Sequence, residues 1–194
     1  MVQVTRNFLA ESPLAPEARA VLLDVFDQGW HDPRKIAQSS VRARQLHQQA
    51  VESLAQNLGL QPSEIEVIGE PALGHYLAIT GLSSAASTLI HSCVDRREIL
   101  EVAGAAGSSI DLPVDQKGRI LSSQYADSGG DVVAILQAAN GETGVIQNLE
   151  ALVSQLGRVE AVAIDFTISG ARILPRLDGI ARLTIRGHGA ARWA

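Results

Sequence analysis

The sequence predicts an α/β protein with three layers around a mostly parallel central sheet. Short apolar runs recur along the second two thirds of the chain, and most are continuous rather than alternating, which is typical of parallel strands buried on both faces. Helical segments separate several of these runs, and the order strand, helix, strand favours parallel pairing through crossover connections. A hydrophobic content of 46% with only 4% aromatic residues indicates an aliphatic core.

Two helices are expected before the first strand. The first shows the i, i+3, i+4, i+7, i+8 spacing of an amphipathic helix: Ala18, Val21, Leu22, Val25 and Phe26. The second is expected over residues 39–58, with Gly59 as its stop signal. We therefore expect a single α/β domain over residues 1–194, with a helical segment at 1–60 and a sheet core at 61–194.

Six runs rich in β-branched residues are the expected strands. They are EIEVI (64–68), TLIHSCV (88–94), SIDLPV (109–114), VVAILQ (132–137), AVAIDF (161–166) and RLTI (182–185). The helices expected between them are PALGHYLAITGL (71–82), DRREILEVAG (95–104) and NLEALVSQLG (148–157). In the last of these, Asn148 is predicted to cap the start of the helix and Gly157 to follow its end.

Charge, hydropathy and cysteine usage exclude several classes of protein. A net charge of -5 with no basic run argues against a nucleic-acid surface. No apolar stretch is long enough for a membrane span, and none near the N-terminus resembles a signal peptide. The single cysteine, Cys93, cannot form an internal disulfide and fits a reducing compartment. We expect a cytoplasmic protein with no membrane segment.

The usual motifs of hydrolytic and metal sites are missing from the sequence. Four histidines, His31, His47, His75 and His91, have no metal-ligand spacing with Cys93 or with paired carboxylates. No Gly-x-Ser-x-Gly nucleophile motif is present. We therefore predict neither a bound metal nor a serine nucleophile.

Four stretches share their order and approximate spacing with the motifs of one family. They are GLQPSEIEVIGEPALGHYLAI (59–79), LPVDQKGRI (112–120), ANGETGVIQ (139–147) and VAIDFTISGARI (162–173). They resemble the cysteine desulfurases, which are class V aminotransferases among the fold-type I pyridoxal phosphate (PLP) enzymes. The resemblance spans roughly residues 7–190. It implies the large domain of that fold, truncated and degenerate, without the small C-terminal domain that carries the family's nucleophilic cysteine.

The same resemblance implies that PLP catalysis is lost. The family holds the cofactor through a lysine that directly follows a histidine, because the lysine amine forms the Schiff base and moves protons. These two positions match His188 and Gly189, so a glycine stands where the lysine belongs. The only two lysines, Lys35 and Lys117, fall in the N-terminal helical region and in a turn, and neither is expected to substitute.

The other cofactor contacts that the resemblance implies are altered as well. In the phosphate loop, Pro71 lacks an N–H group, Ala72 lacks a hydroxyl group, and Glu70 adds a negative charge where the phosphate would lie. The family's ring-stacking histidine matches Arg96, and the glutamine that contacts the ring oxygen matches Ile168. We interpret Arg96, with its two neighbours in the chain, as part of a solvated charged turn that lies near the former cleft and is a candidate for binding an anion.

Three remnant positions are the candidate cofactor-binding residues. Asp165 matches the aspartate that pairs with the pyridine nitrogen, and His188 matches the histidine beside the missing lysine. Asn140 matches the first of two paired asparagines, of which the second is Gly141. We interpret NGETG (140–144) as a tight turn kept for folding, and His188 as a structural hydrogen-bonding residue rather than a base. We predict no catalytic residue.

The truncation also affects the edges of the sheet. In the resembling family one further strand lies between the strands that match EIEVI and RLTI. Without it, those two strands are expected to pair directly, or to leave edges that another chain covers. Fold-type I enzymes are dimers, so a homodimer is expected.

The leading hypothesis is a cysteine desulfurase-like pseudoenzyme that binds no PLP and acts through protein contacts. The expected partners are a second copy, a true cysteine desulfurase, or a sulfur-acceptor or iron–sulfur assembly protein. One alternative is an active PLP enzyme completed by a second chain that carries the lysine. The other is a small-molecule binder that uses the former cofactor cleft, lined by Asp165, Asn140, His188 and Arg96.

Overall fold

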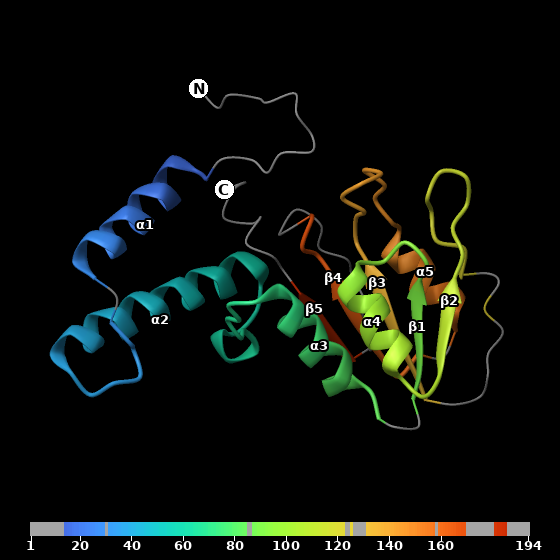
Figure 1. The fold of residues 1–194 in the computed structure, drawn as a ribbon, viewed down its shortest axis with the longest axis horizontal. Coiled ribbons are helices and arrows are strands. Elements are labelled where there is room, and N and C mark those ends of the chain that lie inside the picture. Colours follow the sequence, from blue (N-terminus) through green and yellow to red (C-terminus); the bar gives the residue numbers. More distant parts are fainter. Residues whose placement is uncertain are drawn as a thin grey trace. The chain divides into compact units, whose positions relative to one another are not determined.

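The computed structural model describes residues 14–29, 31–84, 87–122, 125, 131–157, 159–169 and 181–185. The chain forms two compact units, and the boundary between them lies between Ile68 and Gly69. The first unit is helical and the second contains the sheet (Figure 1). Each is described by itself below. The organisation of residues 1–194 as a single domain stays a prediction.

The helical unit contains α1 (Pro16–Gln28), α2 (Gln38–Leu58) and a 3-10 turn, η1 (Pro62–Glu64). Pro16 begins α1, where its missing N–H group costs nothing. Gly59 ends α2 in the left-handed conformation with φ 66°, as its sequence position predicts. The two long helices bury very little, since α1 has no buried residue and α2 has only Ser40 and Ala55.

The expected strand at 64–68 does not form, and this prediction is wrong. Pro62 begins a 3-10 turn that includes Glu64. The Glu64 side chain accepts a hydrogen bond from the backbone N–H of Gln61. Residues 65–68 lie outside any strand, and Val67 and Ile68 are exposed. The predicted pairing of this segment with 182–185 is therefore also wrong.

The second unit is a five-stranded parallel sheet in the order β2-β1-β3-β4-β5. Its strands are β1 (Thr88–Ser92), β2 (Ser109–Leu112), β3 (Val132–Gln137), β4 (Ala161–Asp165) and β5 (Ala181–Ile185). All five lie within the runs that the sequence predicts or differ from them by one residue. Register pairs such as Ile135 with Ala163 fix β3 against β4.

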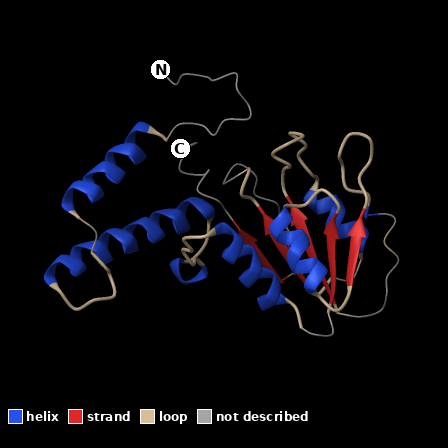
Figure 2. Cartoon of the chain, viewed as in Figure 1, coloured by secondary structure: helices blue, strands red, loops and turns tan. Residues whose placement is uncertain are grey.

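Helices cover both faces of this sheet, as Figure 2 shows. They are α3 (Pro71–Leu82), α4 (Arg97–Ala105) and α5 (Leu149–Leu156). Alternate residues of β3 enter two separate cores. Leu136 packs in the core that includes Leu152 of α5, whereas Ile135 packs with Ile79 of α3 and Ile99 of α4. The predicted three-layer α/β architecture is confirmed.

Two of the predicted turn and cap residues also behave as expected. The side chain of Asn148 accepts a hydrogen bond from the N–H of Ala151 and so caps α5. The NGETG turn after β3 is closed by a hydrogen bond from the N–H of Gly144 to the carbonyl of Asn140, and Gly144 has φ 72°. The parallel strands bring the loops after β1, β3 and β4 to the same edge of the sheet, where parallel α/β folds place their sites.

No helix among the described residues is long and apolar enough to cross a membrane.

Candidate functional site: a saturated carboxylate at the edge of the sheet

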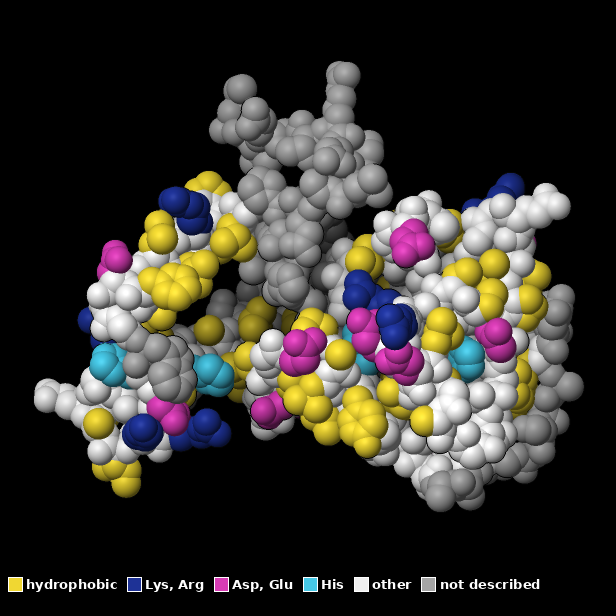
Figure 3. Space-filling view, in the orientation of Figure 1, with side chains coloured by type: hydrophobic (Ala, Val, Ile, Leu, Met, Phe, Trp, Pro, Cys, Tyr) yellow, Lys and Arg dark blue, Asp and Glu magenta, His cyan; other side chains and the backbone are white. Residues whose placement is uncertain are grey.

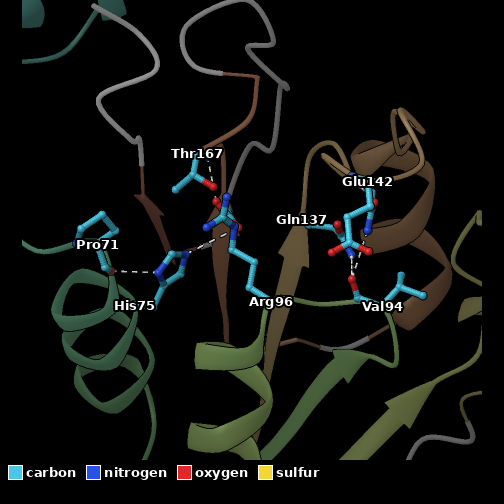
Figure 4. Close-up of polar contacts among 9 residues, drawn as sticks. Pro71, His75, Val94, Arg96, Gln137, Glu142 and Thr167 are labelled. Carbon is cyan, nitrogen blue, oxygen red and sulfur yellow. Dashed lines mark hydrogen bonds and ion pairs between the residues drawn. The ribbon is translucent and has the colours of Figure 1, made fainter. Parts of the chain in front are cut away.

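Asp165 is the last residue of β4, and its carboxylate is the centre of the candidate site. The residue is 4% exposed. Its Oδ1 atom accepts a hydrogen bond of 2.7 Å from the backbone N–H of Thr167. Its Oδ2 atom lies 3.2 Å from Nε of Arg96 and 3.5 Å from Nε2 of His75 (Figure 4). Both oxygens of this carboxylate are therefore engaged by the chain itself.

The charge state of Asp165 follows from these contacts. Burial alone raises the pKa of a carboxyl group, because a low-dielectric surrounding disfavours the charged form. Here hydrogen bonds from His75 and Thr167 outweigh burial and lower the pKa of Asp165 below its ordinary value. The carboxylate is thus held in its ionised form.

His75 approaches Asp165 from α3 and is itself buried. Its Nδ1 atom lies 2.9 Å from the carbonyl oxygen of Pro71. Since a carbonyl only accepts, Nδ1 must carry a proton, and a neutral ring would then present the bare Nε2 to the carboxylate. Burial lowers the pKa of His75, but the hydrogen bond and charge of Asp165 outweigh it and raise the pKa overall. Below this raised pKa the pair is an imidazolium facing a carboxylate, and the distance of 3.5 Å is longer than a good hydrogen bond.

Arg96 and Asp95 come from the loop between β1 and α4. The interpretation of this loop as a solvated charged turn is correct for Arg97, which is exposed and pairs with Glu101. It is wrong for Arg96, which turns inward to Asp165. It is also wrong for Asp95, which is buried and accepts a 2.7 Å hydrogen bond from the N–H of Ser92.

Asp95 has a strongly perturbed pKa. Burial raises the pKa of its carboxyl group to about 7, and the nearby carboxylates of Asp165 and Asp111 add to the effect. At neutral pH this group therefore exists in both its protonated and its ionised form.

Asn140 makes its hydrogen bonds within the turns beside it. Its Nδ2 atom donates to the carbonyl of Val94 at 3.1 Å, and its Oδ1 atom accepts from the N–H groups of Glu142 and Thr143. Gln137 also donates to the carbonyl of Val94 (Figure 4). Asn140 thus ties the loop after β3 to the loop after β1, which agrees with the interpretation of NGETG as a structural turn.

The start of α3 carries a carboxylate of the chain. Glu70 is the N-cap residue, and its side chain accepts a hydrogen bond of 3.3 Å from the N–H of Ala72. Pro71 occupies the first helical position and has no N–H group to offer. The positive end of this helix therefore already faces a negative charge.

Gly141 and Ile168 lie against one another. A Cβ atom built at position 141 would be 2.9 Å from Cδ1 of Ile168, closer than real Cβ atoms approach a neighbour. The side chain of Ile168 thus occupies the space beside the backbone of the NGETG turn.

Several buried polar atoms at this edge of the sheet have no hydrogen-bond partner of good geometry. Those on the described residues here are His75 Nε2, Asp95 Oδ1, Thr167 Oγ1 and Ser169 Oγ. Such atoms are uncommon in folded proteins and mark a strained or functional place.

The sequence-predicted site residues are thus only partly brought together. Asp165 and Asn140 lie at the ends of adjacent strands but make separate sets of contacts. His188 and Gly189 lie outside the described residues. Sequence reasoning missed the roles of His75 and Asp95. The signal for His75 was an ionisable side chain inside an otherwise apolar helical run.

The described residues hold no group of three or more metal-ligating side chains that could bind an ion. Lys117 lies in the turn after β2, as expected, and its backbone N–H donates to Asp115. Lys35 lies between α1 and α2.

Comparisons with known proteins find similar folds among solved structures but no match by sequence. By sequence, no family model and no curated protein matches the chain. By structure, the chain is similar to a NifS-like protein, with 18% identity over 81% of this chain and 47% of the other, at a TM-score of 0.71. A NifS-like protein from Rickettsia africae matches 95% of this chain and 50% of its own, with 16% identity and a TM-score of 0.69.

A third structural neighbour is the cysteine desulfurase CsdA from Escherichia coli, with 15% identity over 81% of this chain and 43% of the other, at a TM-score of 0.60. The chain spans about half the length of these structures. The protein therefore has the cysteine desulfurase-like fold of the large domain of the fold-type I PLP enzymes.

Proposed function

We propose that this protein is a pseudoenzyme of the desulfurase-like fold, which binds no PLP and acts through contacts with other proteins. The observation that carries the proposal is the saturation of Asp165 by His75, Arg96 and Thr167. In the resembling family this aspartate pairs with the pyridine nitrogen of the cofactor. Here His75 and Arg96 of the protein itself already contact this carboxylate, where the pyridine nitrogen of the cofactor would lie.

Two further parts of the PLP site are also occupied by groups of the protein. A phosphate group placed at the start of α3 would meet the carboxylate of Glu70, which already accepts the N–H of Ala72. Beside the NGETG turn, the space next to residue 141 is filled by Ile168. The residues present therefore do not fit PLP, and no reaction step is assigned to it.

This geometry also favours the pseudoenzyme over an enzyme completed by a second chain. A companion chain can supply a lysine. It cannot remove the carboxylate of Glu70 from the helix start or free Asp165 from its two cations.

The helical unit supports the proposed protein contacts. The apolar stripe of α1 is exposed: Val21 is 65% and Phe26 is 72% accessible to solvent. An amphipathic helix that covers nothing gains little stability, because helices in proteins are held mainly by packing of their apolar face. We propose that a second copy covers this face, and that a true cysteine desulfurase or a sulfur-acceptor protein of the cytoplasm is the further partner.

Absorbance spectroscopy with added PLP tests the loss of the cofactor. The purified protein is scanned before and after addition of PLP, then reduced with borohydride and analysed by mass spectrometry. We expect no aldimine band and no adduct. A stable band with a reduced adduct on Lys35 or Lys117 would falsify the pseudoenzyme proposal.

The oligomeric state tests the proposed partner surface. Sedimentation velocity of the intact protein is expected to show a dimer that Phe26→Ser weakens, because the exposed ring of Phe26 is the largest apolar group of the stripe. Ile146→Ser is the matched control, since Ile146 is also exposed but lies in the sheet unit. An unchanged dimer in the Phe26 variant would refute the assignment of this face.

A second candidate function is binding of a small polar molecule at the edge of the sheet. The buried atoms Asp95 Oδ1 and Thr167 Oγ1, which lack hydrogen-bond partners, favour it. Thr167→Val keeps the shape of the side chain and removes the hydroxyl group. If a polar ligand is bound there, native mass spectrometry of the purified protein shows an extra mass that this variant loses.

A further inference from the structure

A shallow and largely open basic hollow lies in the helical unit. It is lined by Arg34, Arg44 and His47, together with Pro33 and Val67. Figure 3 shows Lys, Arg and His side chains gathered over this unit. The lining contains two guanidinium groups, one imidazole and no carboxylate.

Arg44 is held in place by the backbone. Its Nε atom donates to the carbonyl of Pro33 at 2.9 Å, and Nη2 donates to the carbonyl of Lys35 at 3.3 Å. Carbonyl oxygens orient the guanidinium group but do not neutralise its charge. An arginine fixed in this way loses less side-chain entropy when it binds an anion.

Arg34 keeps part of its guanidinium group available. Only Nε is engaged, by Oδ1 of Asp32 at 3.3 Å. The side chain of Arg34 is 88% exposed, whereas that of Asp32 is 17% exposed. The outer nitrogens of the fork can therefore face a ligand in the hollow.

The charge of this segment contrasts with that of the chain. Residues 31–47 carry four Arg or Lys side chains against one carboxylate, Asp32, while the whole chain has a net charge of -5. Within the described part of the helical unit, the Arg34–Asp32 contact is the one ion pair that neutralises a cation of this segment. Cations that no carboxylate neutralises attract small anions to this segment.

We propose that the hollow lined by Arg34, Arg44 and His47 binds the phosphate group of a small phosphate monoester. The outer nitrogens of Arg34, the remaining N–H groups of Arg44 and the imidazole of His47 suit a dianion with several acceptor oxygens better than a single carboxylate. The overall negative charge of the chain repels a long polyanion, so a small ligand is favoured over a nucleic acid. The proposal is independent of the proposed loss of PLP binding, because that loss is argued from residues of the sheet unit. The lining of the hollow also shares no residue with the apolar stripe of α1.

NMR titration of the intact, 15N-labelled protein with inorganic phosphate tests this site. Ionic strength is kept constant with chloride, so that general screening does not change. We expect saturable amide shifts for residues of the 31–47 segment. The double variant Arg34→Gln/His47→Gln replaces the guanidinium of Arg34 and the imidazole of His47 by neutral amides, and it leaves the backbone contacts of Arg44 in place. It is expected to need at least about tenfold more phosphate for half saturation, because hydrogen bonds to charged groups are among the stronger ones.

The matched control is Arg97→Gln. Arg97 is as exposed as Arg34 and also pairs through Nε with one carboxylate, but it lies in the sheet unit. It should leave the titration unchanged. Shifts that stay linear in phosphate, or that are equal in the double variant, overturn the proposal. A parallel titration with dimethyl phosphate should be weaker, and equal or tighter binding of this diester would point to a nucleic-acid backbone instead.

Discussion

The two units of the chain differ in how they use apolar residues. Every residue of β3 is buried, and Phe166 just after β4 is fully enclosed. In α1 no residue is buried, and Phe26 is largely exposed. The described residues of the sheet unit therefore enclose a core of their own, whereas those of α1 bury none of their apolar face. Packing that stabilises the fold is thus concentrated in the sheet unit.

The largest effect is expected when the same substitution is made in both units. Phe166→Ala removes a ring at 0% exposure and should cost about 3–5 kcal/mol of unfolding free energy. Phe26→Ala should change it by no more than about 0.5 kcal/mol at concentrations where the protein is monomeric. Urea unfolding of both variants measures the difference. Equal costs would mean that α1 is packed like the sheet, and the contrast would be lost.

Removing the central carboxylate should have the next largest effect. Asp165→Asn leaves the imidazolium of His75 and the guanidinium of Arg96 without their counter-charge, at a cost of about 3 kcal/mol. The exposed ion pair between Arg97 and Glu101 is the comparison. Glu101→Gln should cost no more than about 0.5 kcal/mol.

Chemical denaturation of the two variants at pH 6 checks this pair of values. A small cost for Asp165→Asn would show that the buried cluster contributes little, in contradiction to its geometry.

Per pH unit, the smallest expected change in stability is the one caused by Asp95. Its pKa is about 7 in the folded protein against a reference of 3.8. Between these values the folded state keeps a proton that the unfolded state has released. Stability therefore falls as pH rises through this window, by up to about 1.4 kcal/mol for each pH unit, and levels off above it.

Asp95→Asn should flatten this slope. The raised pKa of His75 acts in the same direction, with stability lost as pH rises through the folded pKa of the imidazole. That contribution remains in the variant and provides an internal comparison. Unfolding at pH 5, 6, 7 and 8 measures both, and a variant as steep as the wild type between pH 5 and 7 would contradict the assignment to Asp95.

The sheet was largely predictable because parallel strands that are buried on both faces consist of continuous apolar runs, which are visible in the sequence. The run VVAILQ coincides with β3 and PALGHYLAITGL with α3. The prediction of a strand at EIEVI (64–68) was wrong for two reasons. β-branched composition does not show whether a neighbouring strand is available for pairing, and the 3-10 turn that begins at Pro62 includes Glu64. Local pattern therefore predicted elements well and pairing less well.

The candidate site was predictable only where one residue carried the signal. Asp165 ends an apolar strand, and its match to the aspartate of the resembling family made it a candidate. The approach of His75 to Asp165 joins α3 to β4, far apart in sequence. No local pattern reports such a contact. The burial of Asp95 was hidden for the same reason, since its neighbours Arg96 and Arg97 make the loop look solvated.

The exposed face of α1 has a consequence for the amount of protein that a cell can keep. If a second copy covers Val21 and Phe26, a chain that has not yet paired displays an apolar stripe to chaperones and proteases. The unpaired fraction is largest when the protein is scarce, because pairing depends on concentration. Under the proposed assembly, the protein is therefore removed fastest at low concentration and lasts longer once enough copies are present to pair.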